Sequence, residues 1–454
     1  MRSLIFVAVF LWSVLAPATD ARAELFEDGE TVCFLGDSIT AGGRYYSMIA
    51  DYYLTRFPDR TVRFVNAGRS GDTSGGSLNR LQEDVIDHKP TTVVIMFGMN
   101  DVGRGYYVAN PDEKKREAQQ QALDRYQANM EKVVARIREE AGDPKLIFLT
   151  PSPFDQTVEI ERQNQPGCND GLGRCAEIVR ELAAKNNGTV IDFHGPMTAL
   201  NLKRQKEDPT WTIIGGDRVH PGGPGHLMMA WLFLKAQGAP SIVSKVVVDA
   251  AAGSTTESVN AEVTDVAKKD SGVEFTVLEN ALPFPTDPSA KAVLALLPIE
   301  ANLNQQLLSV TGLAPGNYEL QIDGAAVGQY QAEELTSGIN LAFNKATPQL
   351  AQAREVAQHN EQRRNAEAQA CSLLNTRRWM QSYYKVDVDD PAAVQAHYDH
   401  FEDKKQYSAA MALRYIKRWP EYGDLQKQAA SHEEDALTSR TPRPHAFAVA
   451  PVND

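Results

Sequence analysis

The sequence predicts an α/β protein, in which a three-layer α/β/α domain with a five-stranded parallel sheet precedes a small antiparallel β unit and a helical region. Five short apolar runs between residue 31 and about residue 193 alternate with stretches of helical apolar spacing. Runs that are apolar throughout indicate strands covered on both faces, and their alternation with helices indicates a parallel sheet with crossover connections. After residue 245 the pattern changes, which indicates further structural units.

The elements of the first domain, expected over residues 24–245, follow in chain order. The expected strands are 31–35, 61–66, 91–97, 145–150 and 189–193. Helical spacing predicts helices over 44–57, 74–88, 112–140 and 173–186, with 222–238 as the last helix of the domain. In sheets of this kind the chemistry collects beyond the carboxyl ends of the strands, so the polar residues that follow each strand are the candidate site.

Three further segments follow the first domain. Residues 246–345 contain alternating patterns such as YELQIDGAAVGQY, whose Asp323-Gly324 predicts a hairpin turn, so a small β-rich unit is expected there. Residues 346–438 are polar and helical in spacing, and Thr347-Pro348 predicts a helix start with an N-cap followed by proline. Residues 439–454 offer little apolar surface, and we expect a disordered tail.

The N-terminal sequence and the net charge restrict location and partners. Residues 1–23 combine a charged start, a short apolar run and Ala21-Arg22-Ala23, the pattern of a cleaved signal peptide. We therefore expect a secreted or periplasmic protein whose mature chain starts at Glu24 and is not inserted in a membrane. The formal net charge of −13, without a basic stripe, disfavours nucleic acid as a partner. The sequence does not indicate the oligomeric state.

The four cysteines are Cys33, Cys168, Cys175 and Cys371. In an oxidising compartment they allow three complete pairings, and Cys168 and Cys175, which flank the expected loop NDGLGR, are the favoured disulfide. Cys33 lies in an apolar strand and is expected to be a buried free thiol. No pair of Cys or His residues has the spacing typical of a zinc site, so no metal and no cofactor are expected.

Polar clusters follow the first three strands. Gly36-Asp37-Ser38 would place Ser38 at the start of a helix, either as an N-cap or as a nucleophile. Gly71, in the segment NAGRSGDT, could turn its backbone N–H toward a developing oxyanion, or could simply belong to a turn. Asn100, in GMND, offers a side-chain amide as a second type of oxyanion donor.

A fourth cluster, Asp217-Arg218-Val219-His220-Pro221, supplies a base and an acid. Asp217 and His220 are three positions apart on one loop, so the carboxylate can reach Nδ1 of the imidazole and leave Nε2 facing Ser38. Together the clusters provide a nucleophile, a base, an orienting acid and three oxyanion donors: the N–H of Ser38, the N–H of Gly71 and the side chain of Asn100. This set is sufficient for acyl transfer without a metal.

In this order, GDS, SGDTS, GMND and DRVHP resemble the SGNH or GDSL hydrolase superfamily over residues 31 to about 237. The resemblance implies a flavodoxin-like sheet, with Ser38 as nucleophile, His220 as general base, Asp217 as its partner, and Gly71 and Asn100 as oxyanion donors. Beyond residue 245, GNYELQIDG followed by ELTSGINLA resembles an extension of some large bacterial members, for which the resemblance implies no role.

These features predict an exported serine esterase that hydrolyses O-acyl esters, with acetyl groups on carbohydrate as the expected substrate. The superfamily also includes lipases, lysophospholipases and thioesterases, which are the alternative. A non-catalytic carbohydrate-binding protein is an alternative of another class. It would need exposed aromatic side chains on the β unit, where Phe275, Phe284, Tyr318 and Tyr330 are the candidates.

Overall fold

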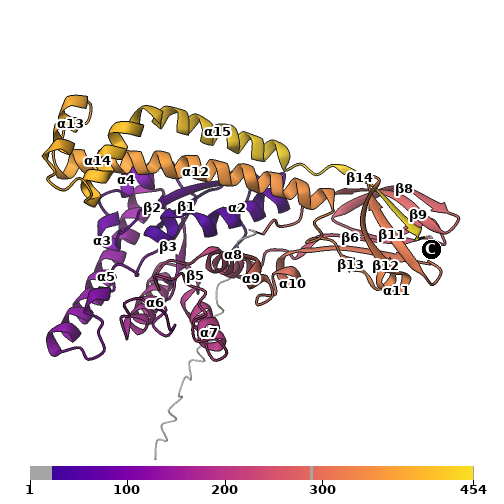
Figure 1. The fold of residues 1–454 in the computed structure, drawn as a ribbon, viewed down its shortest axis with the longest axis horizontal. Helices are drawn as coiled ribbons and strands as arrows, with labels where there is room; N and C mark the ends of the chain where they lie inside the picture. The colour runs from indigo at the N-terminus through magenta and orange to yellow at the C-terminus, as the bar shows by residue number, and fades with distance from the viewer. Residues whose placement is uncertain (1–22, 287–289, 453–454) are drawn as a thin grey trace, which may run out of the picture.

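The structure is a computed structural model that describes residues 23–286 and 290–452. The expected signal peptide lies outside the described residues, apart from Ala23. Figure 1 shows an elongated molecule with the parallel sheet and its helices toward one end, a β-rich unit at the other, and long C-terminal helices along one side. Within the described residues, no helix combines the length and apolar character needed to cross a membrane.

The first sheet has five parallel strands in the order β2-β1-β3-β4-β5, as predicted. The strands are β1 (Thr31–Gly36), β2 (Arg63–Gly68), β3 (Thr92–Met96), β4 (Lys145–Leu149) and β5 (Thr189–Ile191). The side chains of β1 alternate between two hydrophobic cores, one on each face of the sheet. Val32 and Phe34 pack in one core, and Cys33 and Leu35 pack in the other. Both faces of the sheet are therefore covered, which explains why the strands read as continuous apolar runs.

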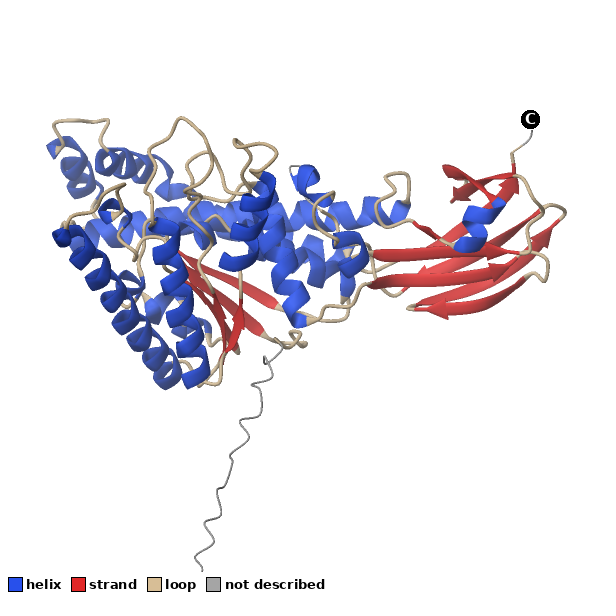
Figure 2. Cartoon of the chain, turned by 90° about the horizontal axis from the view of Figure 1, so that it is seen from below, coloured by secondary structure: helices blue, strands red, loops and turns tan. Residues whose placement is uncertain are grey.

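The helices of this domain form the two outer layers. One core joins the sheet to α2 (Arg44–Arg56), α7 (His194–Arg204) and α8 (Gly223–Gln237), and the other joins it to α5 (Glu113–Glu140) and α6 (Cys168–Lys185). Figure 2 shows these helices around the strands. The helix expected over 74–88 is broken into α3 (Ser74–Ser77), α4 (Leu81–Asp84) and a 3₁₀ turn (Ile86–His88). At the break, Arg80 turns inward to bond the carbonyls of Gly36 and Ala67.

The predicted Cys168–Cys175 disulfide is wrong. Both residues lie in α6 as buried free thiols, and the segment expected to be a loop between them is helical. Seven residues along a helix separate two Cα atoms by about 10 Å. A disulfide requires less than about 7 Å. Cys33 is a buried free thiol, as predicted.

The β-rich unit is a sandwich of two sheets around one apolar core. One sheet has the order β13-β10-β6-β7 and the other β12-β11-β14-β9-β8. Most pairs are antiparallel, as predicted, whereas β6 and β10 run parallel. The strands are β6 (Ile242–Asp249), β7 (Ser254–Val259), β8 (Ala261–Lys269), β9 (Gly272–Glu279), β10 (Gln305–Thr311), β11 (Asn317–Ile322), β12 (Ala325–Gln331), β13 (Ile339–Asn340) and β14 (Pro444–Pro451).

The prediction of a disordered tail over 439–454 is wrong for most of that segment. Strand β14 is the central strand of its sheet and pairs with both β9 and β11. Its alternate residues His445, Phe447 and Val449 are buried, and Phe447 stacks on Phe275 at a centroid distance of 5.2 Å. The segment is polar when read alone, but two neighbouring strands satisfy its backbone and cover its apolar face.

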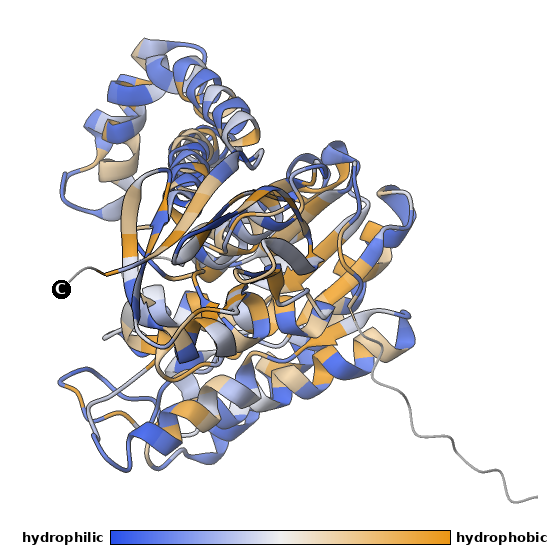
Figure 3. Ribbon diagram, turned by 90° about the vertical axis from the view of Figure 1, so that its right-hand side faces the viewer, coloured by the Kyte–Doolittle hydropathy of each residue, from blue (hydrophilic) through white to orange (hydrophobic). Residues whose placement is uncertain are grey.

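The helical region forms a long antiparallel pair. Helix α12 (Pro348–Tyr383) starts at the predicted N-cap Thr347, and α15 (Tyr422–Ser439) runs back beside it toward β14. Between them lie α13 (Pro391–His400), α14 (Tyr407–Arg418) and a 3₁₀ turn (Trp419–Glu421). Hydropathy colouring shows hydrophilic and hydrophobic residues interspersed along the helices (Figure 3). The short helices α9 (Lys291–Leu294), α10 (Ile299–Leu303) and α11 (Ala332–Ser337) belong to the connections.

Candidate active site

Ser38 lies immediately beyond the carboxyl end of β1, at the first position of the short helix α1 (Ser38–Ala41). Asp37 is the N-cap, and its carboxylate accepts a hydrogen bond from the N–H of Ile39 at 2.9 Å. The preceding Gly36 is required by close packing, because a Cβ there would lie 2.4 Å from Oγ1 of Thr40 and 2.7 Å from the carbonyl oxygen of Met96. The tight strand-to-helix turn therefore fixes the backbone that carries Ser38.

The loop that precedes α8 brings His220 and Asp217 to Ser38. Oγ of Ser38 lies 2.8 Å from Nε2 of His220, and Nδ1 of His220 lies 2.6 Å from Oδ2 of Asp217. Oδ1 of Asp217 accepts hydrogen bonds from the backbone N–H groups of Val219 (3.0 Å) and His220 (2.9 Å). One carboxylate thus holds both the imidazole ring and the backbone of the same loop.

The environment of Asp217 favours its ionised form. Partial burial raises the pKa of this carboxyl, but the hydrogen bonds from the His220 side chain and from the two backbone N–H groups outweigh burial, and the pKa lies below its ordinary value. An ionised acceptor at Nδ1 selects the tautomer in which Nε2 is free to accept a proton. The site is open to solvent, with His220 and Asp217 side chains 49% and 36% exposed.

Gly71 and Asn100 come from the loops that follow β2 and β3. Gly71 has a φ of +76°, a conformation that favours glycine and that turns the backbone within its loop. The side-chain amide of Asn100 donates a hydrogen bond to the carbonyl of Asp72 at 2.8 Å, which ties the two loops together. An amide carries two N–H bonds, so this contact leaves one for a ligand.

The carboxyl groups of Asp37, which is buried, and of Asp101, which is half-buried, lie beyond the ends of β1 and β3. Burial is the main cause that raises the pKa of Asp37 to about 7. Burial likewise raises the pKa of Asp101 to about 6, against hydrogen bonds from Ser74 that lower it. Oδ1 of Asp101 accepts from the N–H of Ser74 at 2.8 Å and from its hydroxyl at 2.5 Å. Perturbed carboxyls of this type are found more often at functional sites than elsewhere.

Residues 34–228 match the GDSL-like lipase/acylhydrolase family. The match covers most of the first domain. Two similar proteins have names of enzymes that cleave esters or thioesters. The acetylxylan esterase of Geobacillus stearothermophilus is 28% identical over 46% of this chain and 94% of its own length. Thioesterase 1/protease 1/lysophospholipase L1 of Escherichia coli K12 is 34% identical over 28% of this chain and 58% of its own length.

The similarity to a solved structure extends to the C-terminal units. A gut microbial diltiazem-metabolizing enzyme has 29% sequence identity and a TM-score of 0.86, covering 95% of this chain and 99% of its own. The β sandwich and the long helices are therefore part of a shared architecture. The family match, together with the esterases to which this chain is similar, identifies the chain as a serine ester hydrolase.

Arg218 contributes to the site although the sequence assigned it no role. Arg218 is 3% exposed, and its guanidinium donates to the carbonyls of Asp155, Val158, Ile160 and Arg162. An arginine in the middle of a polar motif is typical of a solvated side chain. Its hydrogen-bond acceptors here are backbone carbonyls, which cannot be recognised from the sequence. Its effect is to anchor the loop that holds Asp217 and His220.

Arg80 likewise anchors the loops that follow β1 and β2. Its guanidinium donates to the carbonyls of Gly36 and Ala67 and forms ion pairs with Asp72 at 2.7 Å and Asp84 at 3.0 Å. These contacts join the turn before Ser38 to the loop that contains Gly71. No signal in the sequence distinguishes Arg80 from an ordinary surface arginine of a helix.

Helix α12 lies against the domain close to the site. Arg69, in the loop before Gly71, donates to Oδ1 of Asn375 in α12 at 2.7 Å. Arg364 of the same helix donates to the carbonyl of Gly42 at 2.7 Å. The helical region therefore contacts the segment after Ser38 and the loop before Gly71, a proximity that the sequence did not indicate.

Proposed function

We propose that Ser38 is the nucleophile, His220 the general base and Asp217 the orienting acid of this esterase. The observation that carries the proposal is the continuous chain of contacts from Oγ of Ser38 through His220 to Asp217. His220 removes the hydroxyl proton while Oγ attacks the ester carbonyl, and it then protonates the departing alcohol. Water repeats these steps on the acyl-enzyme and releases the acid.

The oxyanion donors in this proposal are the N–H of Ser38, the N–H of Gly71 and the side-chain amide of Asn100. They belong to loops that follow three adjacent strands, β1, β2 and β3. Ser38 is at the start of a helix, where backbone N–H groups have no partner within the helix. The contacts of Arg80 and Asn100 hold these loops rigidly, as stabilisation of a transient charge requires.

Replacement of the hydroxyl tests the catalytic assignment. Ser38→Ala should abolish hydrolysis of p-nitrophenyl acetate, with an unchanged Tm, because the change removes one exposed oxygen atom and no packed group. Ser254→Ala, at an exposed position of β7, is the matched control. Turnover by Ser38→Ala at more than about one thousandth of the parent rate would contradict the assignment.

For the substrate, we propose a short acyl group, acetyl in particular, on a carbohydrate. Two observations support it: the open site, which suits a bulky alcohol, and the similarity to an acetylxylan esterase along most of that enzyme's length. The aromatic residues that the carbohydrate-binding alternative required do not lie on the surface, because Phe275, Phe284 and Tyr318 are buried and Tyr330 is half-buried.

A series of esters separates the substrate classes. With p-nitrophenyl esters of increasing acyl length, kcat/KM should be highest for acetate, and acetate should be released from acetylated xylan. Highest activity at eight or more carbons would favour the lipase or lysophospholipase alternative, and preference for an acyl thioester would favour a thioesterase. The partial similarity to a protein named thioesterase and lysophospholipase makes this comparison necessary.

We also propose that residues 1–23 act as a signal peptide and that the esterase works outside the cytoplasm. The proposal rests on the charged start, the apolar run and the small residues at 21–23. N-terminal sequencing of the protein recovered from the secreting cell should give Glu24 as the first residue. Recovery of protein that retains the first 23 residues would contradict it.

A further inference from the structure

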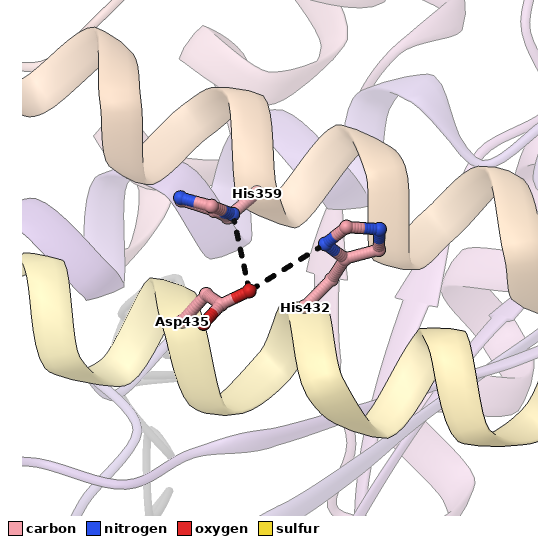
Figure 4. A group of neighbouring side chains, drawn as sticks. All are labelled: His359, His432 and Asp435. Carbon is pink, nitrogen blue, oxygen red and sulfur yellow. Dashed lines mark ion pairs between the residues drawn. The ribbon is translucent and has the colours of Figure 1, made fainter.

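A cluster of possible metal ligands lies between the two long C-terminal helices, at the side chains of His359, His432 and Asp435. His359 belongs to α12, while His432 and Asp435 are three residues apart on α15. Figure 4 shows both imidazole rings directed toward the same carboxylate. Among the described residues, this is the group of three or more His, Cys, Asp or Glu whose ligand atoms all lie within 4.8 Å of one another.

The two histidines face each other with unused nitrogen atoms. Nδ1 of His359 and Nδ1 of His432 are both shielded from solvent and have no hydrogen-bond partner among the described residues. They lie 3.7 Å and 3.8 Å from Oδ2 of Asp435, too far for a hydrogen bond. Buried imidazole nitrogen atoms normally have a hydrogen-bond partner. Two such atoms without one, on either side of the same carboxylate oxygen, therefore indicate a binding site for an ion.

The ligand types and spacings suit a transition metal ion. Neutral histidine nitrogen and carboxylate oxygen are the ligands that Zn²⁺ takes at about 2.0–2.2 Å. Tetrahedral geometry with bonds of that length separates ligand atoms by about 3.3–3.6 Å. The two Nδ1–Oδ2 distances would contract by a few tenths of an ångström, and the ligand atoms of the two histidines, which lie within 4.8 Å of each other, by at most about 1.5 Å. Side-chain rotations of the two histidines and Asp435 can supply these movements. Asp435 is 49% exposed, which leaves a route for the ion and a position for water.

We propose that His359, His432 and Asp435 form a binding site for one divalent transition metal ion, with Zn²⁺ as the expected occupant, that clamps α12 to α15. The spacing rules applied to the sequence could not find this site, because its ligands come from two helices far apart in the chain. The expectation of no metal rested on those rules.

The location gives the ion a structural role. Asn360, next to His359, donates hydrogen bonds to Asp51 at 2.7 Å and to Ser47 at 3.1 Å in the first domain. On the other side, α15 leads directly into β14, the central strand of the sandwich. An ion at the cluster would therefore stabilise the contact of the helical pair with both other units. Binding to the folded chain raises its stability by mass action.

Titration of the full chain, without a histidine tag, with ZnCl₂ alone tests the proposal. Calorimetry should show saturable binding of one ion per chain, and excess Zn²⁺ at a hundredfold Kd should raise the Tm by about 3 °C. His359→Gln and Asp435→Asn should each weaken binding at least tenfold. Co²⁺ should give the intense visible absorption of a tetrahedral site, and His359→Gln should abolish it.

Two control variants distinguish this site from other histidines. His400→Ala removes an exposed histidine of α13, and His220→Ala removes the histidine of another exposed His–Asp pair. Both should bind Zn²⁺ like the parent. Lack of saturable binding, or equal binding by the parent and Asp435→Asn, would overturn the proposal and leave a simple His–Asp ion-pair cluster. Loss of binding in either control would also overturn it. If His359→Gln does not fold, the exposed Asp435→Asn decides the result.

Discussion

Arg218 and Asp155 are joined in both directions: Nη1 of Arg218 donates to the carbonyl of Asp155 at 3.0 Å, and the N–H of Asp155 donates to the carbonyl of Arg218 at 3.0 Å. The link connects the segment after β4 to the loop that carries Asp217 and His220. Arg218 itself has a φ of +67°, an uncommon conformation for a residue with a side chain. The contacts of its guanidinium hold this conformation in place.

Replacement of Arg218 should therefore lower the catalytic rate, although Arg218 is not one of the reacting groups, because its guanidinium holds the loop that carries His220. Arg218→Met keeps much of the side-chain volume but leaves backbone carbonyls without a donor, at a cost of about 1–3 kcal/mol in the free energy of unfolding. A small displacement of His220 should lower kcat for p-nitrophenyl acetate about 10- to 100-fold, with little change in KM. Steady-state kinetics and urea unfolding measure both effects, and Lys203→Met on exposed α7 is the matched control. A parent-like kcat in Arg218→Met would show that the loop holds its position without the guanidinium.

Asp37 should make stability depend on pH. Its pKa is raised to about 7 in the folded chain, chiefly by burial, against about 3.9 for an unfolded aspartate. The folded chain then binds more protons between these values, so the stability of the parent should fall as pH rises from about 4 to about 7.

Asp37→Asn should remove this dependence, because asparagine keeps the N-cap acceptor without the buried charge. The variant should be the more stable one, by at most about 4 kcal/mol above pH 7, and the difference should shrink to near zero at pH 4. Chemical unfolding of the two proteins at several pH values measures it. A difference that is constant with pH, or of opposite sign, would contradict the raised pKa.

The last strand should be essential to the sandwich. Phe447 is 4% exposed and stacks on Phe275, so Phe447→Ala should destabilise the β unit by about 3–5 kcal/mol. Ala450→Ser, at an exposed position of the same strand, should change little. Thermal unfolding by circular dichroism compares the two. Equal stability of Phe447→Ala and the parent would mean that β14 is not a packed strand in solution.

The parallel sheet could be predicted from the sequence because its signal is local. Each strand, such as Thr92–Met96, is an apolar run between helical patterns, and burial on both faces needs nothing but apolar side chains. Strand β14 was missed for the opposite reason. Its exposed positions hold only Ala and Pro, and Phe447 and Val449 are its only large apolar side chains on the buried face. Its stability comes from β9 and β11, which precede it by more than a hundred residues.

The candidate site divides in the same way. Ser38, Asp217 and His220 have side chains whose chemistry marks them within short motifs. Arg80 and Arg218 were not predicted, because they act by donating hydrogen bonds to backbone carbonyls that every residue possesses. Cys168 and Cys175 were misread as a bridged pair because the segment between them, with its two glycines, resembles a loop although α6 passes through it.

The most direct test of the account is covalent labelling with a fluorophosphonate, which phosphonylates an activated serine. The contact between Ser38 and His220 predicts one adduct per chain, located by mass spectrometry on the peptide that contains Ser38, and slowed at least a hundredfold in His220→Ala. An adduct on a different serine, or equal labelling rates in the parent and His220→Ala, would contradict the central claim.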